Sequence, residues 1–221
     1  MVAEFCVSRT CEDILQRKTH AMAGISPFNS YYSETTIKNI ISWCQSFKNY
    51  HLFVPDNLPY YNFLGSGYSA KRAKAKTEHQ WRYLRNKIFR AFMHFGIEPE
   101  MAKCRLVTTS ELENNTQYNR ILESIFSQFE NDPDFRTACM NASKAFIKIN
   151  TSASAKGSAN ISVEYLIREL PLYLDTPKIV GVQESVFVYH ENISFFTDIF
   201  VHRENVFLSP NQGHVILKIN K

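Results

Sequence analysis

The chain has 221 residues, with 25 Lys and Arg against 21 Asp and Glu, so its formal net charge is +4. Hydrophobic residues make up 44% of it and charged residues 21%, with seven Gly and eight Pro, which excludes collagen-like, low-complexity and disordered chains. The length suits a single domain over residues 1–221.

The five cysteines are scattered and form no C-x-x-C pair, so neither a zinc site nor a disulfide framework is predicted. Separated thiols are typical of a reducing compartment, and we therefore expect a cytoplasmic protein. No apolar run approaches the ~20 residues of a membrane helix, and residues 1–10 lack the pattern of a secretion signal. We expect no membrane association, and a monomer.

Segments with the patterns of strands and helices alternate along the chain. Strands are predicted over residues 18–25, 50–54, 104–108, 185–189 and 215–219, and helices over 34–47, 69–95, 116–129, 133–149, 162–170 and 193–201. Ser33 is the expected N-cap of the first helix, and residues 151–160 read as a loop of small residues. The alternation predicts an α/β fold: a mostly parallel sheet with helices on both faces and ligands at the carboxyl ends of its strands.

The positive charge is concentrated in the helix predicted over residues 69–95, which no Gly or Pro interrupts and which Gly96 ends. Its apolar residues at helical spacing are Trp81, Leu84, Ile88, Phe92 and Phe95. Its basic residues are Lys71, Arg72, Lys74, Lys76, Arg82, Arg85, Lys87 and Arg90, against one acid, Glu78. So few acids exclude intrahelical ion pairing as the purpose of the charge. A solvated helix face and a nucleic-acid-binding ridge remain, and the imbalance favours nucleic acid.

Familiar catalytic signatures are absent from the sequence. There is no phosphate-binding G-x-x-x-x-G-K-[ST] loop, no G-x-G-x-x-G, no H-E-x-x-H and no G-x-S-x-G around Ser26. The seven histidines show no metal-ligand spacing. We therefore expect neither a metal nor a cofactor.

Three short runs carry possible chemistry. The first, Gly24-Ile25-Ser26-Pro27-Phe28-Asn29, lies where a strand should end. Ser26 and Pro27 could simply begin a helix, with Ser26 as N-cap, or Ser26 could accept an acyl group beside free backbone N–H groups.

The second run, residues 165–171, places Tyr165 and Glu169 four apart on one face of an apolar helix. Such a pair can hold an ammonium group or form a structural hydrogen bond. The third run, residues 186–190, ends a strand with Tyr189 and His190, which would either pack or reach the ligand edge of the sheet.

Together and in this order, the three runs resemble the motifs of the tRNA-dependent cyclodipeptide synthases. Residues 24–29 resemble the nucleophile segment G-x-S-x-x-N, and residues 165–171 resemble the Y-x-x-x-E-x-P helix. Asn29 with Tyr189 and His190 resembles the Asn/Tyr-His signature of one subfamily. The basic helix lies between the first two motifs, where the family has its tRNA-binding helix.

The resemblance implies a Rossmann-like domain similar to the catalytic domain of tyrosyl- and tryptophanyl-tRNA synthetases. It implies a ping-pong reaction in which Ser26 is acylated by one aminoacyl-tRNA, the amine of a second attacks, and the dipeptide cyclises to a 2,5-diketopiperazine. No ATP-binding HIGH or KMSKS motif is present, so the amino acids would arrive already activated as tRNA esters.

The resemblance also implies roles for single residues. Glu169 and Tyr165 would hold the α-ammonium group, Asn29 and the backbone near Gly24 would position the acyl group, and Tyr189, supported by His190, would assist proton transfer. The implied lining of the first amino-acid pocket is Met22, Val54, Leu172 and Phe187, with Glu191 able to favour a polar or cationic side chain. Two other readings stay open: an RNA-binding module without chemistry, and a synthetase-like domain that edits or transfers aminoacyl groups.

Overall fold

A computed structural model describes residues 2–6, 9–150, 159–191, 195 and 208–219. A six-stranded sheet in the order β1-β6-β5-β2-β3-β4 forms its centre. The strands are β1 (Val2–Cys6), β2 (His20–Gly24), β3 (Asn49–Val54), β4 (Leu106–Thr108), β5 (Ser185–Tyr189) and β6 (Gln212–Ile219). The pairs from β6 to β4 are parallel, and β1 joins β6 antiparallel at the edge. The predicted α/β fold with a mostly parallel sheet is confirmed.

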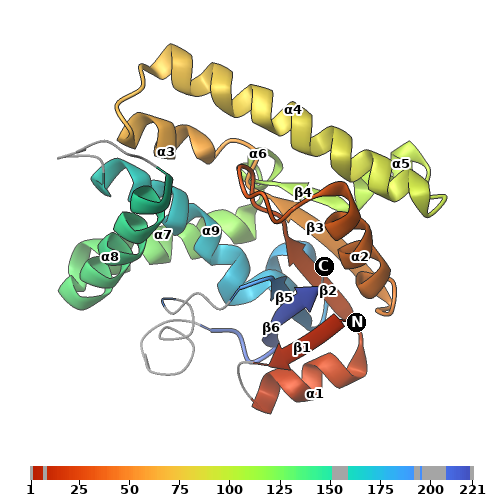
Figure 1. The fold of residues 1–221 in the computed structure, drawn as a ribbon. Helices are drawn as coiled ribbons and strands as arrows, with labels where there is room; N and C mark the ends of the chain where they lie inside the picture. Colours follow the sequence, from red (N-terminus) through yellow and green to blue (C-terminus); the bar gives the residue numbers. More distant parts are fainter. Residues whose placement is uncertain (1, 7–8, 151–158, 192–194, 196–207, 220–221) are drawn as a thin grey trace.

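The helices cover both faces of the sheet (Figure 1). They are α1 (Arg9–Arg17), α2 (Glu34–Cys44), α3 (Pro59–Gly65), α4 (Ala70–His94), α5 (Pro99–Cys104), α6 (Thr109–Leu112), α7 (Thr116–Asn131), α8 (Pro133–Asn150) and α9 (Ala159–Val180). One apolar cluster joins the sheet to α1, α2, α4 and α5. A second cluster joins the other face to α7, α8 and α9.

The two clusters follow from the alternation of side chains along each strand. In β2, Ala21 and Ala23 belong to the first cluster and Met22 to the second. In β5, Val186 and Val188 face the first cluster, and Phe187 faces the second. Strands that are apolar on both faces are typical of a buried parallel sheet, because both faces are covered by helices.

The structure contains β1, α1, α3, α5 and α6, which were not predicted, and it differs from the prediction at both ends of α9. The helix expected to end before Pro171 continues as α9 to Val180, with a kink where Asp175 has φ −155° and ψ 60°. Buried Leu170, Leu172 and Leu174 hold this stretch in the second cluster, which offsets the hydrogen bond that Pro171 removes. Residues 159–160, expected in a loop, belong to α9. The rest of that loop, and all but residue 195 of the helix expected over 193–201, lie outside the described residues.

Candidate active site

The loop after β2 carries Ser26 and does not start a helix. Residues 27 and 28 form a turn, and α2 begins only at Glu34, where Ser33 accepts a hydrogen bond from the Thr36 N–H. The N-cap reading of Ser26 is therefore wrong, whereas the predicted cap at Ser33 is confirmed. Phe28 adopts the left-handed conformation with φ 65°, which costs about 1–2 kcal/mol for a residue with a Cβ. This sharp turn leaves Ser26 partly exposed at the carboxyl end of β2.

Ser26 lies among tyrosines from two other elements. Its Oγ is 2.8 Å from the hydroxyl of Tyr189, which ends β5, the neighbouring parallel strand. Tyr165 on α9 hydrogen-bonds both Ser26 and Glu169, and the two bonds shift its pKa in opposite directions. The structure thus brings together Ser26, Tyr189, Tyr165 and Glu169, as the sequence motifs predict.

Glu169 is the site residue whose pKa matters most near neutral pH. Its carboxyl group is surrounded by protein, and this desolvation raises its pKa to about 8, although a hydrogen bond from Tyr165 opposes the rise. An α-ammonium group bound here would favour the ionised carboxylate, because an opposite charge stabilises it. The pKa of a free α-amine, about 8, is close to that of this carboxyl before binding, so the incoming amine and the carboxyl together carry the one proton that the ion pair needs.

Tyr165 and Tyr189 remain protonated at neutral pH. Burial, followed by the charge of Glu169, raises the pKa of Tyr165 well above its usual value. Burial also raises the pKa of Tyr189 to about 12, even though the hydrogen bond with Ser26 lowers it. Both hydroxyls can therefore donate hydrogen bonds to the reacting oxygens.

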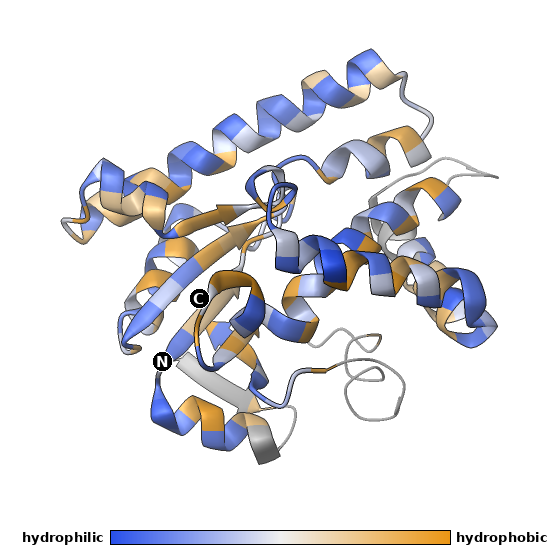
Figure 2. Cartoon of the chain, turned by 180° about the vertical axis from the view of Figure 1, so that it is seen from behind, coloured by the Kyte–Doolittle hydropathy of each residue, from blue (hydrophilic) through white to orange (hydrophobic). Residues whose placement is uncertain are grey.

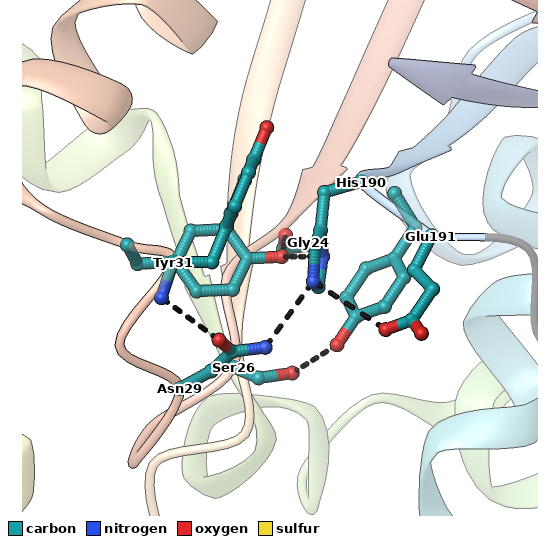
Figure 3. Close-up of polar contacts among 8 residues, drawn as sticks. Gly24, Ser26, Asn29, Tyr31, His190 and Glu191 are labelled. Atoms are coloured by element: carbon teal, nitrogen blue, oxygen red, sulfur yellow. Dashed lines mark hydrogen bonds and ion pairs between the residues drawn. The ribbon is translucent and has the colours of Figure 1, made fainter. Parts of the chain in front are cut away.

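His190 and Asn29 contact each other beside Ser26 (Figure 3). The Asn29 amide nitrogen is 3.3 Å from His190 Nε2, and the Asn29 carbonyl oxygen accepts a 2.9 Å bond from the Tyr31 N–H. Both polar ends of Asn29 are thus engaged, one by its own loop and the other by His190 after β5. Burial lowers the pKa of His190, and the charge of Glu191 raises it in part.

Gly24 sits where a side chain would collide with two neighbours. A Cβ at this position would lie 3.1 Å from Phe187 Cζ and 3.4 Å from Tyr189 Cδ2. The Gly24 carbonyl oxygen accepts a 2.9 Å bond from the Tyr32 hydroxyl. Gly24 therefore allows β5 and its Tyr189 to approach the end of β2.

The residues expected to line the first pocket are all buried, but they do not share one cluster. Met22, Leu172 and Phe187 pack together with α9, whereas Val54 faces the cluster on the opposite side of the sheet. Glu191 is largely exposed, with a carboxylate oxygen 3.7 Å from His190 Nε2. On the side of the sheet that faces α9, the expected lining thus consists of three apolar side chains, and the exposed carboxylate of Glu191 is not part of this cluster.

Helix α4 matches the predicted basic helix, with Ser69 capping its N-terminus. Leu84, Ile88 and Phe92 are buried, and Trp81 and Phe95 pack partly buried against the first cluster. Figure 2 shows hydrophilic colouring along much of its length. The exposed basic side chains are Lys71, Arg72, Lys74, Arg82, Arg85 and Arg90, and the partly buried ones are Lys76 and Lys87.

The basic residues of α4 differ in whether other side chains already occupy their charge. Arg90 donates a 2.8 Å bond to the Glu34 carboxylate on α2, which occupies part of its charge. Lys76 lies over the rings of Phe63 and Tyr68. Lys71 and Lys74 line a cavity of about 550 Å³ between α3 and α4, together with Tyr60 and acidic side chains. Arg82 and Arg85 are the clearest cations left for a polyanion.

Sequence reasoning missed Tyr31 and Tyr32, which complete the site around His190. The His190 ring stacks on Tyr31 with 4.2 Å between ring centroids, and its Nδ1 is 3.0 Å from the Tyr32 hydroxyl. The local sequence holds no signal for these roles, because Tyr32 and His190 are 158 positions apart. Among the described residues, no three His, Cys, Asp or Glu side chains are grouped as metal ligands would be, and no helix could cross a membrane.

Comparison with known proteins places these residues in a family. A family model described as "Cyclodipeptide synthase" matches residues 4–219. A cyclo(L-leucyl-L-leucyl) synthase from Staphylococcus haemolyticus is 29% identical over 96% of this chain and 92% of its own length.

Solved structures agree. A cyclodipeptide synthase from Bacillus thermoamylovorans superposes with a TM-score of 0.90 at 28% identity, over 99% of this chain and 97% of that one. A Mycobacterium tuberculosis protein superposes with a TM-score of 0.86 at 26% identity, over 99% and 94%. Its structure is described as demonstrating that cyclodipeptide synthetases are related to type I tRNA synthetases, which confirms the expected Rossmann-like architecture.

Proposed function

This chain belongs to the cyclodipeptide synthase family, and we propose that it condenses the amino acids of two aminoacyl-tRNAs into a cyclic dipeptide through an aminoacyl-enzyme on Ser26. The observation that carries the proposal is the grouping of Ser26 with the Tyr189 hydroxyl, 2.8 Å away, and with Tyr165 and Glu169. A nucleophile, hydroxyl donors and a carboxyl able to hold an ammonium group are what the reaction needs.

In the first step, Ser26 Oγ attacks the ester carbonyl of one aminoacyl-tRNA. An ester forms on Ser26, the ester to the terminal ribose breaks, and the serine proton ends on the ribose hydroxyl of the released tRNA. Tyr189 and Tyr165 stand beside Ser26 and stay protonated, so they can donate to the oxygens that gain charge. Glu169, once ionised, holds the α-ammonium group by a charge-assisted bond.

Two attacks of an amine on an ester complete the product. One forms the first peptide bond and the other closes the ring, and between them they release Ser26 and the second tRNA as free hydroxyls. Each amine must lose a proton before it attacks, and Glu169, with a pKa of about 8, is suited to accept it. Because both esters are already activated, the balance requires no ATP.

We place the tRNA on α4, whose exposed Arg82 and Arg85 have few acidic neighbours. Charge complementarity to the phosphate backbone supports this placement. The substrates are cytoplasmic and the five cysteines are thiols, which supports a cytoplasmic location. We propose that the chain acts as one domain and as a monomer.

We propose an apolar amino acid for the first site. Met22, Leu172 and Phe187 are fully buried in one cluster on the α9 side of the sheet, and Leu172 follows Glu169 by three positions on α9. The Staphylococcus haemolyticus relative is named for leucyl substrates, which agrees with such a lining. A cationic residue in the product would instead indicate that Glu191 reaches the pocket.

The test is mass spectrometry of the medium of cells that express the wild type or Ser26→Ala. A cyclic dipeptide present only with the wild type would support the proposal and identify both amino acids. Absence of the product with retained tRNA binding would favour an RNA-binding module. Release of free amino acid from aminoacyl-tRNA without cyclisation would favour an editing domain.

A further inference from the structure

We infer that Tyr32 is a positioning residue for the acylation of Ser26, because its hydroxyl fixes His190 in the tautomer that carries the proton on Nδ1. Through His190 and Asn29, Tyr32 then holds the loop that bears Ser26. The acylation part of this inference rests on the proposed function, whereas the tautomer follows from the hydrogen bonds alone.

The Gly24 carbonyl oxygen fixes the direction of the Tyr32 hydroxyl proton. A carbonyl oxygen can only accept, so the Tyr32 hydroxyl donates its single proton to the Gly24 oxygen, 2.9 Å away. The same hydroxyl lies 3.0 Å from His190 Nδ1 and has only lone pairs left for this contact. His190 Nδ1 must therefore be the donor, and it carries the proton.

The bonds from the Tyr31 backbone to Asn29 and from Asn29 to His190 indicate the same tautomer. Its N–H donates to the Asn29 carbonyl oxygen at 2.9 Å, which fixes the orientation of the amide. The amide nitrogen of Asn29 then faces His190 Nε2 at 3.3 Å. An NH₂ group can only donate, so Nε2 must accept and carries no proton.

The other polar groups around His190 are consistent with this neutral tautomer. The Tyr32 hydroxyl also contacts Tyr189, and this bond raises the pKa of Tyr32 and lowers that of Tyr189, which fits Tyr32 as the donor. Shared between Gly24 and Tyr189, the single Tyr32 proton still leaves only a lone pair for His190 Nδ1. Glu191 Oε2 is 3.7 Å from Nε2, too far for a hydrogen bond. A proton on Nε2 would face the Asn29 amide and break that contact.

The result is a chain of hydrogen bonds that all run in one direction (Figure 3): from Tyr31 to Asn29, to His190, to Tyr32 and to Gly24. It begins in the loop after β2 and ends at Gly24, the last residue of β2, so it spans Ser26 from both sides. His190, which directly follows β5, closes the chain and ties the loop to the strand that carries Tyr189. Loss of the Tyr32 hydroxyl would leave the buried Nδ1–H without its acceptor and loosen the loop.

The test compares Tyr32→Phe with Tyr31→Phe in the full-length protein. Both remove a hydroxyl from adjacent rings that contact His190, but the Tyr31 hydroxyl does not contact the ring nitrogens. The ¹⁵N shifts of His190 distinguish the two tautomers. Acid-quenched transfer of a radiolabelled amino acid from aminoacyl-tRNA to Ser26 gives kcat and KM for acylation.

We expect the wild type and Tyr31→Phe to show His190 with its proton on Nδ1. Tyr32→Phe should lose this pattern and lower kcat for acylation about tenfold at unchanged KM, since Tyr32 is only 2% exposed and is out of reach of a bound tRNA. Asn29→Asp, a second variant, puts an acceptor opposite Nε2, so His190 should gain a proton there.

Three results would overturn the inference. These are an Nε2 proton in the wild type, an unchanged tautomer in Tyr32→Phe, and a changed tautomer with normal acylation. If the wild type showed the Nδ1 proton but never became labelled, the proposed function and the positioning role would fail, and the tautomer would stand.

Discussion

At the residue scale, Glu169 combines a chemical advantage with a cost in stability. Its carboxyl group is desolvated, and its pKa of about 8 lies far above that of an exposed glutamate. Between the unfolded value near 4.5 and the folded value near 8, the unfolded chain releases a proton that the folded chain keeps. The free energy of unfolding must therefore fall as the pH rises through this range.

The prediction for Glu169→Gln follows from this difference. The variant should lose cyclic dipeptide formation by at least about 100-fold, because glutamine can neither pair with an ammonium group nor accept its proton. At pH 7 it should be more stable than the wild type by about 3 kcal/mol, and at pH 4.5 nearly equal. Urea unfolding at both pH values measures this, and equal stabilities at pH 7 would contradict the raised pKa.

Gly24→Ala should impair the site through its neighbours. The new Cβ would lie 3.1 Å from Phe187 Cζ, closer than side chains usually pack, and in ordinary contact with Tyr189 at 3.4 Å. Because Phe187 is fully buried, we expect a loss of about 1–3 kcal/mol in the free energy of unfolding and about tenfold in acylation rate, since strain at Phe187 is passed to Tyr189 two residues further along β5. Gly213→Ala is the matched control: it crowds Val186 and Cys11 in the same sheet, so stability should fall without the specific loss of rate per folded molecule.

The sequence predicted the main participants at this scale and missed their connections. Ser26, Tyr165, Glu169 and Tyr189 meet as the motifs indicate, because each motif lies at a strand end or on one helix face. The roles of Tyr31 and Tyr32 depend on His190, more than 150 positions away in the chain. Local patterns carry no information about such contacts.

At the scale of elements, α4 shows how packing sorts a run of like charges. Its apolar stripe fixes which basic residues are exposed, and Arg90 is further engaged by Glu34. Lys87 reaches back to the backbone oxygen of Tyr32 at 3.4 Å, which connects the helix with the active-site loop. Among the described residues, neither Arg82 nor Arg85 forms an ion pair like that of Arg90 or a backbone hydrogen bond like that of Lys87; Arg85 lies over the Phe89 ring.

Neutralising these two arginines should weaken tRNA binding and lower its salt dependence. For Arg82→Gln with Arg85→Gln, the slope of log K against log salt should fall by about 1–2. Arg90→Gln should have a smaller effect, because Glu34 already balances part of its charge. Filter binding over a salt series measures the slope, and Lys103→Gln on α5 is a control outside the ridge. An unchanged slope in the double variant would place the tRNA elsewhere.

Element prediction succeeded where end signals were strong. The 185–189 strand and the ends of α4 at Ser69 and Phe95 agree with the structure. The prediction missed β1, α1, α3 and the short helices α5 and α6, which are brief and gain their stability from tertiary packing. It also ended the last long helix at Pro171, because the burial that carries α9 past this residue is not visible locally.

At the scale of the whole molecule, two histidines of the sheet, His20 in β2 and His214 in β6, determine how the free energy of unfolding changes in acid. His20 bonds Ser185 at 2.7 Å and His51 at 2.9 Å, and burial lowers its pKa to about 3. His214 bonds the Tyr173 carbonyl at 3.1 Å, and burial lowers its pKa to about 4. The unfolded chain binds protons at these positions near pH 6.5, before the folded chain does.

Stability should therefore fall as the pH drops from 7 to 5. Each of His20 and His214 contributes a loss of about 2 kcal/mol. Glu169 opposes this loss, because between pH 7 and 5 its folded form keeps a proton that most of its unfolded form has lost. The loss should be clearest in Glu169→Gln, where the opposing contribution is removed. Urea unfolding of this variant at pH 7 and 5 gives the value, and a rise in stability on acidification would contradict the lowered histidine pKa values.

The antiparallel pair of β1 and β6 has a consequence for biosynthesis. Among the described residues, β1 pairs only with β6, which also covers the free edge of β5. Until residues 212–219 have been made, the strand that carries Tyr189 has an unpaired edge, and β1 has no place in the sheet. The order of synthesis therefore sets the order of assembly: Ser26 and Glu169 are in the nascent chain long before the strand that fixes Tyr189 beside them.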